Sequence, residues 1–351
     1  MFKLHIFSRK LIYNLMIPVF SILSAIVVGG IIISAMGNDP ILAYQALLKG
    51  AFGNTRAILT TISRSVILMF TGLAVAFAFK SRAFNIGAEG QMLVGALVAG
   101  LAGVYLTGLP AIIHLPLVLL LSVIAGAVWA FFPAFFKVTR NVHIVISTIM
   151  FNYIALYIVQ YLALGPFQDP GPMPATSRIA ETAMLPWLVS NVLNYGIVIA
   201  ISCMVIIYLI LERTRLGYEI KAVGISPSAA EYNGIDVKKT IFISMLISGA
   251  LAGLGGGLEV VGNYYRFVDG FSPGYGFTGI PVALLARNNP FAIILSAILL
   301  GALNSGAIQM QVTAGVSAQI AFLLQGIIIL FIASENAIRW SLNWFKEVVI
   351  S

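Results

Sequence analysis

Long apolar stretches without charged side chains recur along this sequence, and they constrain its fold more than any other feature. The first runs from Leu11 to Met36 and follows Lys3, Arg9 and Lys10. Because about 20 apolar residues span the hydrocarbon core of a bilayer, each such stretch predicts a transmembrane helix. Charged residues make up only 9% of the 351 residues and hydrophobic ones 60%. This is too little charge to cover a soluble protein, so an all-α, polytopic membrane protein is predicted.

Further apolar stretches meet the same length criterion. They are Ala57–Phe79, Gly90–Thr107, Leu115–Phe136, Val142–Leu164, Tyr195–Leu211, Thr240–Gly262, Phe291–Met310 and Ala318–Ser334. A shorter piece, Phe277–Ala286, lies between Gly and Pro residues and is predicted to be a half-helix or a re-entrant segment. Since a signal peptide has an apolar core of only about 7–15 residues, residues 11–36 are predicted to remain as the first spanning helix. About ten transmembrane elements result, within a single integral-membrane domain over residues 1–351.

The basic residues predict the orientation of the chain. With both termini in the cytoplasm, most of the 20 Lys and Arg residues fall in cytoplasmic loops, in agreement with the positive-inside tendency. Two loops are long. The extracellular loop, residues 165–194, is rich in proline and is predicted to be a semi-rigid connector. The other long loop, residues 212–239, is cytoplasmic and has basic residues near both ends.

The long cytoplasmic loop contains the local signals of a short helix. Gly224 breaks the regular structure of the loop, Ser226 can cap a new helix, and Pro227 suits the first position of that helix. Gly234 is expected to end that helix. The loop is therefore predicted to hold a short, solvated helix between two membrane spans.

Two parts of the chain are predicted to form an inverted repeat. Residues 57–164 start outside and hold four elements, and residues 240–334 start inside and also hold about four. Each part has a glycine-interrupted stretch, FNIGAEGQ over residues 84–91 and GYGFTGIP over residues 274–281. Matching broken segments in two halves of a membrane protein point to a translocation site.

Signatures of enzymes and of metal sites do not occur in the sequence. It has no GxxxxGK[ST] phosphate loop, no HExxH, no GxSxG and no paired carboxylates at helical spacing within the spans. Cys203 is the single cysteine, and the three histidines are far apart. The chain is predicted not to be an enzyme and to need no cofactor or metal. Its net charge of +8 is explained by cytoplasmic loops, so no nucleic-acid partner is predicted.

A few ionisable residues fall within or beside the predicted spans, where a charge is costly. Glu89 is expected either to face a pathway or to cap the N-terminus of its own span. Arg64 is expected either to be functional or to extend to the interface, and Glu259 to be interfacial or to line an outer vestibule. The spans lack a cluster of Asp and Glu, which argues for an energy source outside this chain and for a neutral, hydroxylated substrate.

Small and neutral polar residues in the spans have a packing interpretation beside any functional one. Gly249, Gly253 and Gly257 form overlapping GxxxG spacings and are predicted to let helices approach closely. Neutral polar side chains are candidates for lining a pathway, or they join helices by hydrogen bonds. Those considered are Asn152, Tyr153, Asn304 and Gln309.

Three stretches resemble one known family. RAFNIGAEGQMLVGALVAG, NVHIVISTIMFNYIALYI and the run from GYEIKAVGISPSAAEYNGIDVKK onward are similar to permease subunits of bacterial ABC importers for nucleosides and simple sugars. FNIGAEGQ resembles the nucleoside branch, which uses basic-membrane-protein-type lipoprotein receptors. The similarity covers residues 57–334 and implies the ten-helix fold shared with vitamin B12 importers.

The resemblance also implies partners and site residues. The partners are a cytoplasmic ABC ATPase subunit, a second permease subunit and an extracytoplasmic substrate-binding lipoprotein, in a bacterial cell membrane. The coupling segment that fits a groove of the ATPase would include Gly224, Pro227, Ala229, Ala230, Glu231 and Gly234. Asn85, Glu89 and Gln91 would lie near the pathway.

The resemblance implies import of nucleosides, with purine nucleosides favoured. The alternative within the family is a simple sugar such as ribose or galactose. Alternatives outside it are a stand-alone secondary transporter and a membrane scaffold that transports nothing. A solvated docking helix between two spans argues against a stand-alone carrier, which has no use for it.

Overall fold

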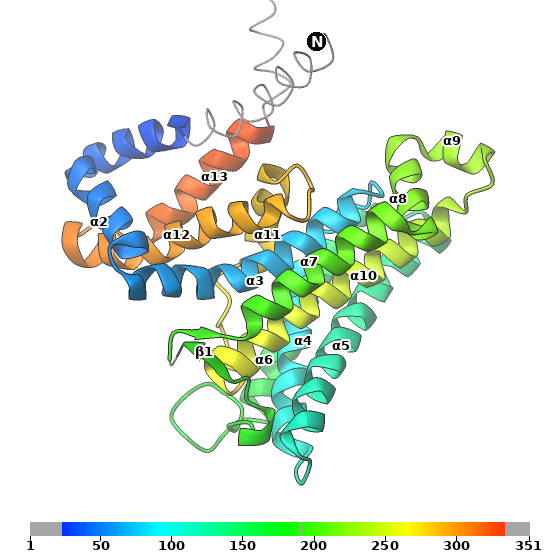
Figure 1. Ribbon diagram of the computed structural model, residues 1–351, viewed down its shortest axis with the longest axis horizontal. Coiled ribbons are helices and arrows are strands. Elements are labelled where there is room, and N and C mark those ends of the chain that lie inside the picture. Colours follow the sequence, from blue (N-terminus) through cyan, green and yellow to red (C-terminus); the bar gives the residue numbers. More distant parts are fainter. Residues whose placement is uncertain (1–22, 190, 334–351) are drawn as a thin grey trace, which may run out of the picture. The chain divides into compact units, whose positions relative to one another are not determined.

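The computed structural model describes residues 23–189 and 191–333, and most of them are helical (Figure 1). The predicted first span falls partly within this range, and an apolar helix covers Leu23–Ala35. Residues 11–22, Ser334 and both termini lie outside the described residues.

Within the described residues, seven helices are long and apolar enough to cross a membrane. All seven overlap predicted stretches. They are α3 (Thr55–Phe79), α4 (Ala88–Tyr105), α5 (Ala111–Arg140), α6 (Ile144–Leu164), α7 (Gly196–Arg213), α10 (Val237–Glu259, continued by the π-helical turn η2, Val260–Tyr264) and α12 (Ala292–Ala314). The predicted half-helix Phe277–Ala286 corresponds to the short helix α11 (Tyr275–Leu285). The predicted span Ala318–Ser334 contains α13 (Gln319–Ala333), of which 15 residues are described.

Two helices were not expected from hydropathy. One is α2 (Pro40–Phe52), whose start is defined by Asp39, since its side chain accepts hydrogen bonds from the amides of Ile41 and Leu42. The other is α8 (Arg215–Ile225), which precedes the predicted short helix α9 (Pro227–Tyr232). The loop over residues 212–239, predicted to be cytoplasmic, thus contains a pair of helices.

The chain divides into two compact units. The first combines residues 1–58 with residues 302–351, and the second comprises residues 59–301. These boundaries follow packing and differ from those of the predicted inverted repeat, which stays a prediction.

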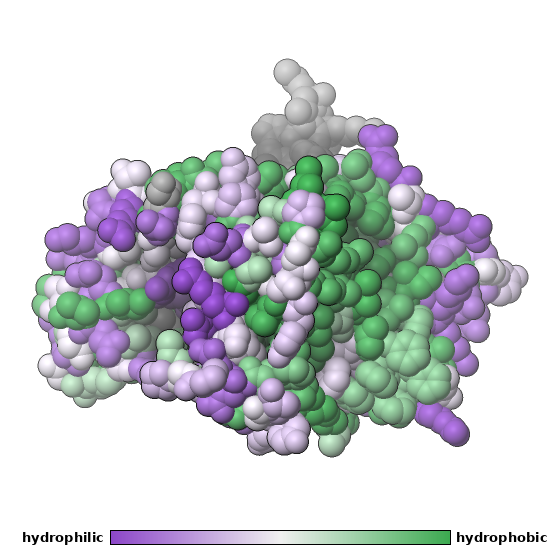
Figure 2. Space-filling view, turned by 90° about the horizontal axis from the view of Figure 1, so that it is seen from below, coloured by the Kyte–Doolittle hydropathy of each residue, from purple (hydrophilic) through white to green (hydrophobic). Residues whose placement is uncertain are grey.

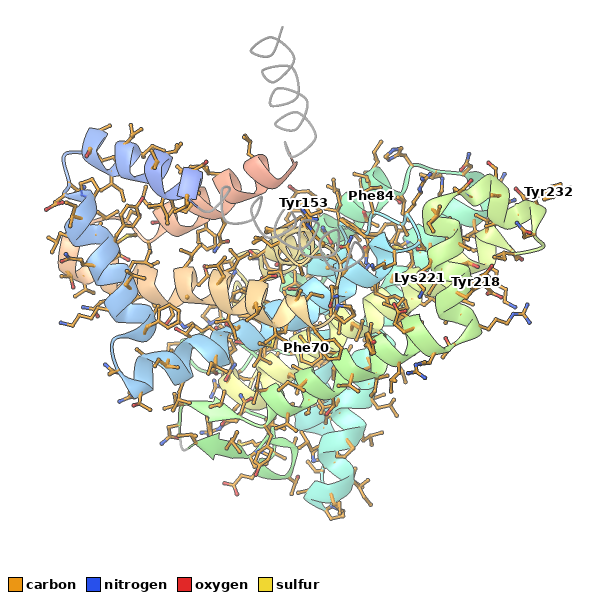
Figure 3. The ribbon with its side chains drawn as sticks, turned by 45° about the horizontal axis from the view of Figure 1, so that its top comes forward. Phe70, Phe84, Tyr153, Tyr218, Lys221 and Tyr232 are labelled. Carbon is orange, nitrogen blue, oxygen red and sulfur yellow. The ribbon has the colours of Figure 1, made fainter. Side chains whose placement is uncertain are left out.

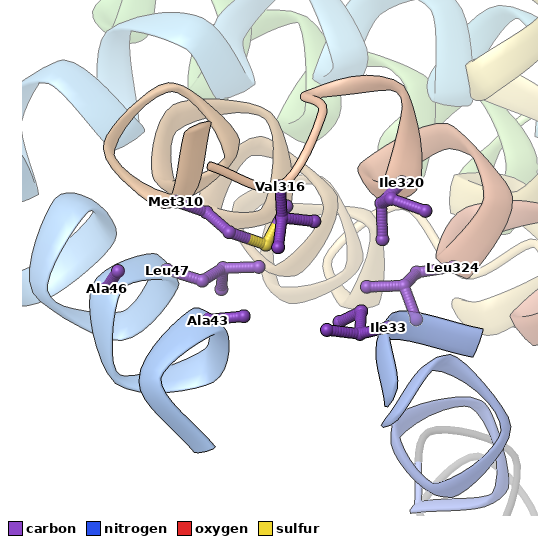
Figure 4. Close-up of a cluster of buried hydrophobic side chains, with 8 residues drawn as sticks. All are labelled: Ile33, Ala43, Ala46, Leu47, Met310, Val316, Ile320 and Leu324. Atoms are coloured by element: carbon purple, nitrogen blue, oxygen red, sulfur yellow. The ribbon is translucent and has the colours of Figure 1, made fainter. Parts of the chain in front are cut away.

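The first unit has its own small apolar core, shown in Figure 4. Its buried residues come from the helix Leu23–Ala35, from α2, from the end of α12, from α13 and from the connection between α12 and α13. They are Ile33, Ala43, Ala46, Leu47, Met310, Val316, Ile320 and Leu324. Gly50 and Gly306 allow α2 and α12 to touch at the backbone within this unit.

The second unit is built around α10, which packs along both α4 and α5. A Cβ atom at Gly253 would overlap Gly126 of α5, and one at Gly95 of α4 would overlap Gly253. Gly249 also meets the backbone of Gly126. We call Gly95, Gly126, Gly249 and Gly253 the glycine seam. The packing predicted for the GxxxG spacings is therefore confirmed.

Several helices of the second unit keep apolar side chains on their outer faces. Only 22% of the most apolar stretch of α5 is buried, against 78% for α3. Figure 2 shows one face on which hydrophobic residues cover a broad area, with hydrophilic residues gathered in patches. Such surfaces suit contact with lipid or with another membrane subunit.

The proline-rich loop between α6 and α7 is ordered by backbone hydrogen bonds. It contains a 3-10 turn, η1 (Glu181–Ala183), and a two-stranded sheet of β1 (Trp187–Val189) and β2 (Leu193–Asn194). The amide of Thr176 donates to the carbonyl of Phe267, and that of Ile179 to Tyr265. The loop thereby covers the connection between η2 and α11.

Candidate functional site

The segment Arg82–Gln91, called here the polar segment, joins the end of α3 to the start of α4 and is held by buried side chains. Asn85 is fully buried and donates to Gln91 Oε1 at 2.9 Å and to Ser248 Oγ at 2.8 Å. Its Oδ1 accepts from the Gly87 amide at 2.9 Å and from Gln91 Nε2 at 3.1 Å. Each amide side chain therefore satisfies the other, as buried polar groups require.

A second amide side chain, Asn152 of α6, holds the polar segment from its other side. Asn152 Nδ2 donates to the carbonyl of Ile86 at 2.9 Å, and its Oδ1 accepts from the amide of Gly90 at 2.9 Å. The Gly90 amide belongs to the first turn of α4, where backbone donors lack partners within the helix. Asn152 therefore caps α4 from a neighbouring helix.

Glu89 connects the polar segment to α11. Its carboxylate accepts from the amide of Gly276 at 2.6 Å and also hydrogen-bonds with Ser272. It therefore lies at the N-terminus of α11, where the free amides and the helix dipole favour a negative charge. Glu89 lies in the first turn of α4, whose cap residue is Gly87 and has no side-chain cap hydrogen bond, and its carboxylate caps α11 instead.

The two glycine-interrupted stretches of the sequence meet at this point. A Cβ atom at Gly276 would overlap the backbone of Glu89, so no side chain fits between α11 and the start of α4. Gly274, with φ of +98°, turns the chain into α11 in a conformation that favours glycine. Gly279 packs against the backbone of Thr71 in α3. Both α3 and α4 therefore hold the short helix.

An acidic and a basic side chain interact near the other end of α10. Glu259 accepts from Asn263 Nδ2 at 2.9 Å, and it interacts electrostatically with Arg64 of α3. Neighbouring tyrosines, Tyr264 and Tyr275, face the same two charges. The Arg64 side chain thus has an acidic partner inside the second unit, which neither interpretation from sequence had specified.

The helices α8 and α9 form a hairpin that projects from the second unit (Figure 3). Ser226 Oγ accepts from the Ala229 amide at 3.3 Å, Pro227 occupies the first helical position, and Gly234 has φ of +78°. The start and the end predicted for α9 are therefore confirmed. Ala230 packs inward, whereas Tyr232 at the tip is 93% exposed. Such a tip suits contact with another protein.

The remaining candidates lie elsewhere. Tyr153 follows Asn152 in α6, but its side chain is 57% exposed on the outer face of that helix. Asn304 and Gln309 belong to the first unit. There, Asn304 Oδ1 accepts from Gln325 Nε2 at 2.8 Å, and Gln309 Nε2 donates to Thr313 Oγ1 at 2.8 Å. The second unit thus brings together Asn85, Glu89, Gln91 and Asn152.

The comparison with protein families decides the class of the chain. The model of the family described as the permease component of the branched-chain amino acid transport system matches residues 57–333. The chain belongs to this permease family. The permease is accordingly a multi-pass membrane protein and a transport component.

Individual relatives resemble the permease over almost its full length. The guanosine ABC transporter permease protein NupP of Bacillus subtilis is 40% identical over 96% of this chain and 98% of its own. The nucleoside ABC transporter permease protein NupB of Lactococcus lactis is 35% identical over 96% of both chains. The glucose ABC transporter permease protein TsgB13 of Haloferax volcanii is 35% identical over 91% of this chain and 87% of its own. No solved structure matches the chain significantly.

Sequence reasoning missed several residues that hold this site in the permease. Ser248 of α10 accepts from Asn85 and donates to the carbonyl of Ala74 at 2.6 Å, and Ser272 accepts from the Tyr275 amide at 3.0 Å. A serine in a membrane helix carries no local signal of such a partner. Arg82 was visible in the RAFNIGAEGQ stretch, but its partners are distant in sequence.

Proposed function

We propose that this permease is the membrane-spanning subunit of an ATP-driven importer of nucleosides, with purine nucleosides favoured. The observation that carries the proposal is the 40% identity to a guanosine permease over 98% of that protein's length. The similarity to a nucleoside permease of Lactococcus lactis points the same way. Spans without a cluster of carboxylates also fit a neutral cargo that moves without a coupled ion.

The energy for transport is proposed to enter through the α8–α9 hairpin. A cytoplasmic ATPase subunit would hydrolyse ATP and grip the hairpin, and this chain would have no ATPase site of its own. The exposed tip and the defined ends of α9 support this role. The proposed contact residues are Gly224, Pro227, Ala229, Ala230, Glu231 and Gly234.

The pathway is proposed to run beside the polar segment. Asn85, Gln91 and Asn152 use their hydrogen bonds on one another and on backbone groups, so they would shape the wall of the pathway. Glu89 would set the position of α11 in that wall. The proposal also includes Tyr153, Asn304 and Gln309 as further candidates beside the pathway.

The full assembly is proposed to contain a second permease subunit and an extracytoplasmic substrate-binding lipoprotein. We propose about ten membrane elements, an inverted repeat over residues 57–164 and 240–334, and cytoplasmic termini. Loops predicted to lie on the same side of the membrane do pair, which supports the alternation of sides along the chain. Arg82, in a loop predicted to be cytoplasmic, reaches α8, while the predicted extracellular loop pairs with residues 265–268.

Uptake of labelled guanosine tests the proposal. Cells that lack this permease should lose most guanosine uptake, and a plasmid copy should restore it. Competition with unlabelled adenosine, uridine and glucose would define the substrate class. Unchanged guanosine uptake in the deleted cells would refute nucleoside import by this permease.

A sugar is the second candidate, because a glucose permease of Haloferax volcanii is also 35% identical over most of both chains. The same deleted strain separates the two. If glucose or ribose uptake falls and guanosine uptake does not, the cargo is a sugar and the nucleoside assignment is wrong.

A further inference from the structure

The end of α8 is held by a side chain from the polar segment. Arg82 Nε donates to the carbonyl of Gly224 at 2.9 Å, and Arg82 Nη2 donates to the carbonyl of Ile225 at 2.9 Å. These two carbonyls lie in the last turn of α8, where acceptors have no partner within the helix and a positive charge is favoured. The planar guanidinium therefore caps α8 with two charge-assisted hydrogen bonds.

The backbones of α8 and of the end of α3 also touch beside this contact, so there is little room for one to move without the other. A Cβ atom at Gly224 would overlap the carbonyl oxygen of Lys80, which brings α8 directly against the end of α3. Arg82 itself has φ of +60°, in a turn closed by a hydrogen bond from the Ala83 amide to the Ala78 carbonyl at 3.1 Å. A non-glycine residue in this conformation is uncommon and needs surrounding structure to hold it.

Charges around Lys80 add a second link between the same elements. The Lys221 ammonium of α8 lies 3.0 Å from the carboxylate of Glu212 at the end of α7. Burial lowers the pKa of Lys80 below its ordinary value, whereas nearby Glu212 raises that pKa and Lys221 lowers it. The three groups thus face one another where α3, α7 and α8 meet.

A short stretch of chain leads from this contact to α11. Three residues after Arg82, Asn85 is fully buried and bonded to Gln91 and Ser248, and Glu89 then holds the amide of Gly276. Every link is a short hydrogen bond or a direct backbone contact. A displacement of the hairpin therefore has a continuous physical route to the N-terminus of α11.

We propose that Arg82 is a positioning residue that transmits movement of the α8–α9 hairpin to the polar segment and, through Glu89, to α11. The inference rests on the proposed function, in which an ATPase moves this hairpin. It goes beyond that function by assigning the link between the hairpin and the pathway wall to one side chain.

Coupling of ATP hydrolysis to transport is the first test. The permease is assembled with its ATPase, its partner permease and its binding protein in proteoliposomes, and labelled guanosine uptake and ATP hydrolysis are measured together. Arg82→Ala should lower the guanosine transported per ATP about tenfold, within the usual range of coupling between two sites. Arg82→Lys, which keeps the charge but not the forked geometry, should fall between Arg82→Ala and the wild type.

Two further variants separate transmission from a merely structural cap. Arg215→Ala removes an exposed arginine from the same helix, whose ion pair with Glu219 lies at the surface, and it should behave as the wild type. Gly224→Ala pushes α8 away from Lys80 and should lower the same ratio, even if Arg82→Ala does not assemble. An unchanged ratio in both Gly224→Ala and Arg82→Lys, or uptake and ATP hydrolysis falling in parallel, would overturn the inference.

Hydrogen exchange on the purified chain tests the link without any substrate, so its outcome does not depend on the proposed cargo. In Arg82→Ala or Arg82→Lys, exchange should become about tenfold faster in residues 83–91 and in residues 272–278, relative to Arg215→Ala. Faster exchange confined to residues 215–225 would mean that Arg82 only caps α8, and the inference would fail. If the wild-type assembly does not transport guanosine at all, the proposed function is refuted instead.

Discussion

The glycine seam and the polar segment both join helices of the second unit, but by opposite means. At the seam, α4, α5 and α10 touch at the backbone because Gly95, Gly126, Gly249 and Gly253 have no side chains to separate them. At the polar segment, a few amide and carboxylate side chains bridge elements that are distant in sequence. Many small contacts make the seam rigid. At the polar segment only a few hydrogen bonds join the helices, and these bonds can break and re-form together.

The largest effect is expected from filling the seam. Gly253→Leu would force apart α5 and α10, and overpacking of this kind costs about 3 kcal/mol or more. The variant should be nearly absent from the membrane, as measured by immunoblot and by the thermal midpoint in detergent. Gly326→Leu is the matched control, since among the described atoms none lies within 4 Å of a Cβ at that position. Equal abundance of the two variants would contradict the rigid seam.

A smaller effect on abundance and a large effect on transport are expected at Glu89. Glu89→Ala leaves the buried amide of Gly276 without an acceptor, at a cost of about 2 kcal/mol. If that cost falls on the working position of α11, guanosine uptake per molecule should fall about 30-fold. Glu89→Gln keeps an acceptor oxygen and should lose less. Wild-type uptake by Glu89→Ala would show that α11 does not depend on this bond.

Adjacent residues of α6 give a matched pair with a moderate effect. Asn152→Ala removes both hydrogen bonds to the polar segment and should cost about 1–3 kcal/mol, measured as a lower thermal midpoint. Tyr153→Ala changes an exposed side chain on the outer face and should shift the midpoint little in detergent. If Tyr153→Ala were the more damaging of the two, the polar segment would not be the structural unit described here.

The smallest effect on stability is expected at the α8–α9 hairpin. This hairpin is the exposed end of the second unit. Gly234 has φ of +78°, and within the described chain no atom lies within 4 Å of a Cβ there, so a substitution is opposed only by backbone strain. Gly234→Val should cost about 1–2 kcal/mol and reduce coupling to the proposed ATPase subunit, whereas asparagine in Gly234→Asn tolerates this conformation. Pull-down of the ATPase subunit and uptake per ATP measure the difference. If Gly234→Val and Gly234→Asn bind the ATPase subunit equally and give the same uptake per ATP, Gly234 is not a coupling residue.

Features encoded by neighbouring residues could be predicted from the sequence. Nine long apolar stretches were predicted to span, and seven of them coincide with spanning helices among the described residues, because a bilayer fixes their length. The ends of α9 could also be predicted, because Ser226, Pro227 and Gly234 act within one or two turns of themselves. The helix α2 was missed since it is too short to span, and its local signals are limited to the cap at Asp39 and to Pro40 at its first position.

Long-range partners could not be predicted in the same way. Glu89 was singled out as a costly charge, but its partner at Gly276 lies in the other half of the chain. Arg82 bonds to two carbonyl groups of α8, and a backbone carbonyl leaves no trace in the amino-acid sequence. The Arg64 and Glu259 interaction likewise depends on how α3 and α10 pack.

The contact between Glu89 and the start of α11 has an electrical consequence. The carboxylate is balanced by backbone amides and by the dipole of a helix of 11 residues, and these carry no net charge that must be moved with it. Because these partners are neutral, an ionised Glu89 keeps its full negative charge, and a rearrangement that moves it along the membrane normal works with or against the membrane potential, where one elementary charge is worth about 2.3 kcal/mol per 100 mV. Import at a fixed ATP level should therefore differ between polarised and depolarised vesicles, and the difference should be smaller in Glu89→Gln.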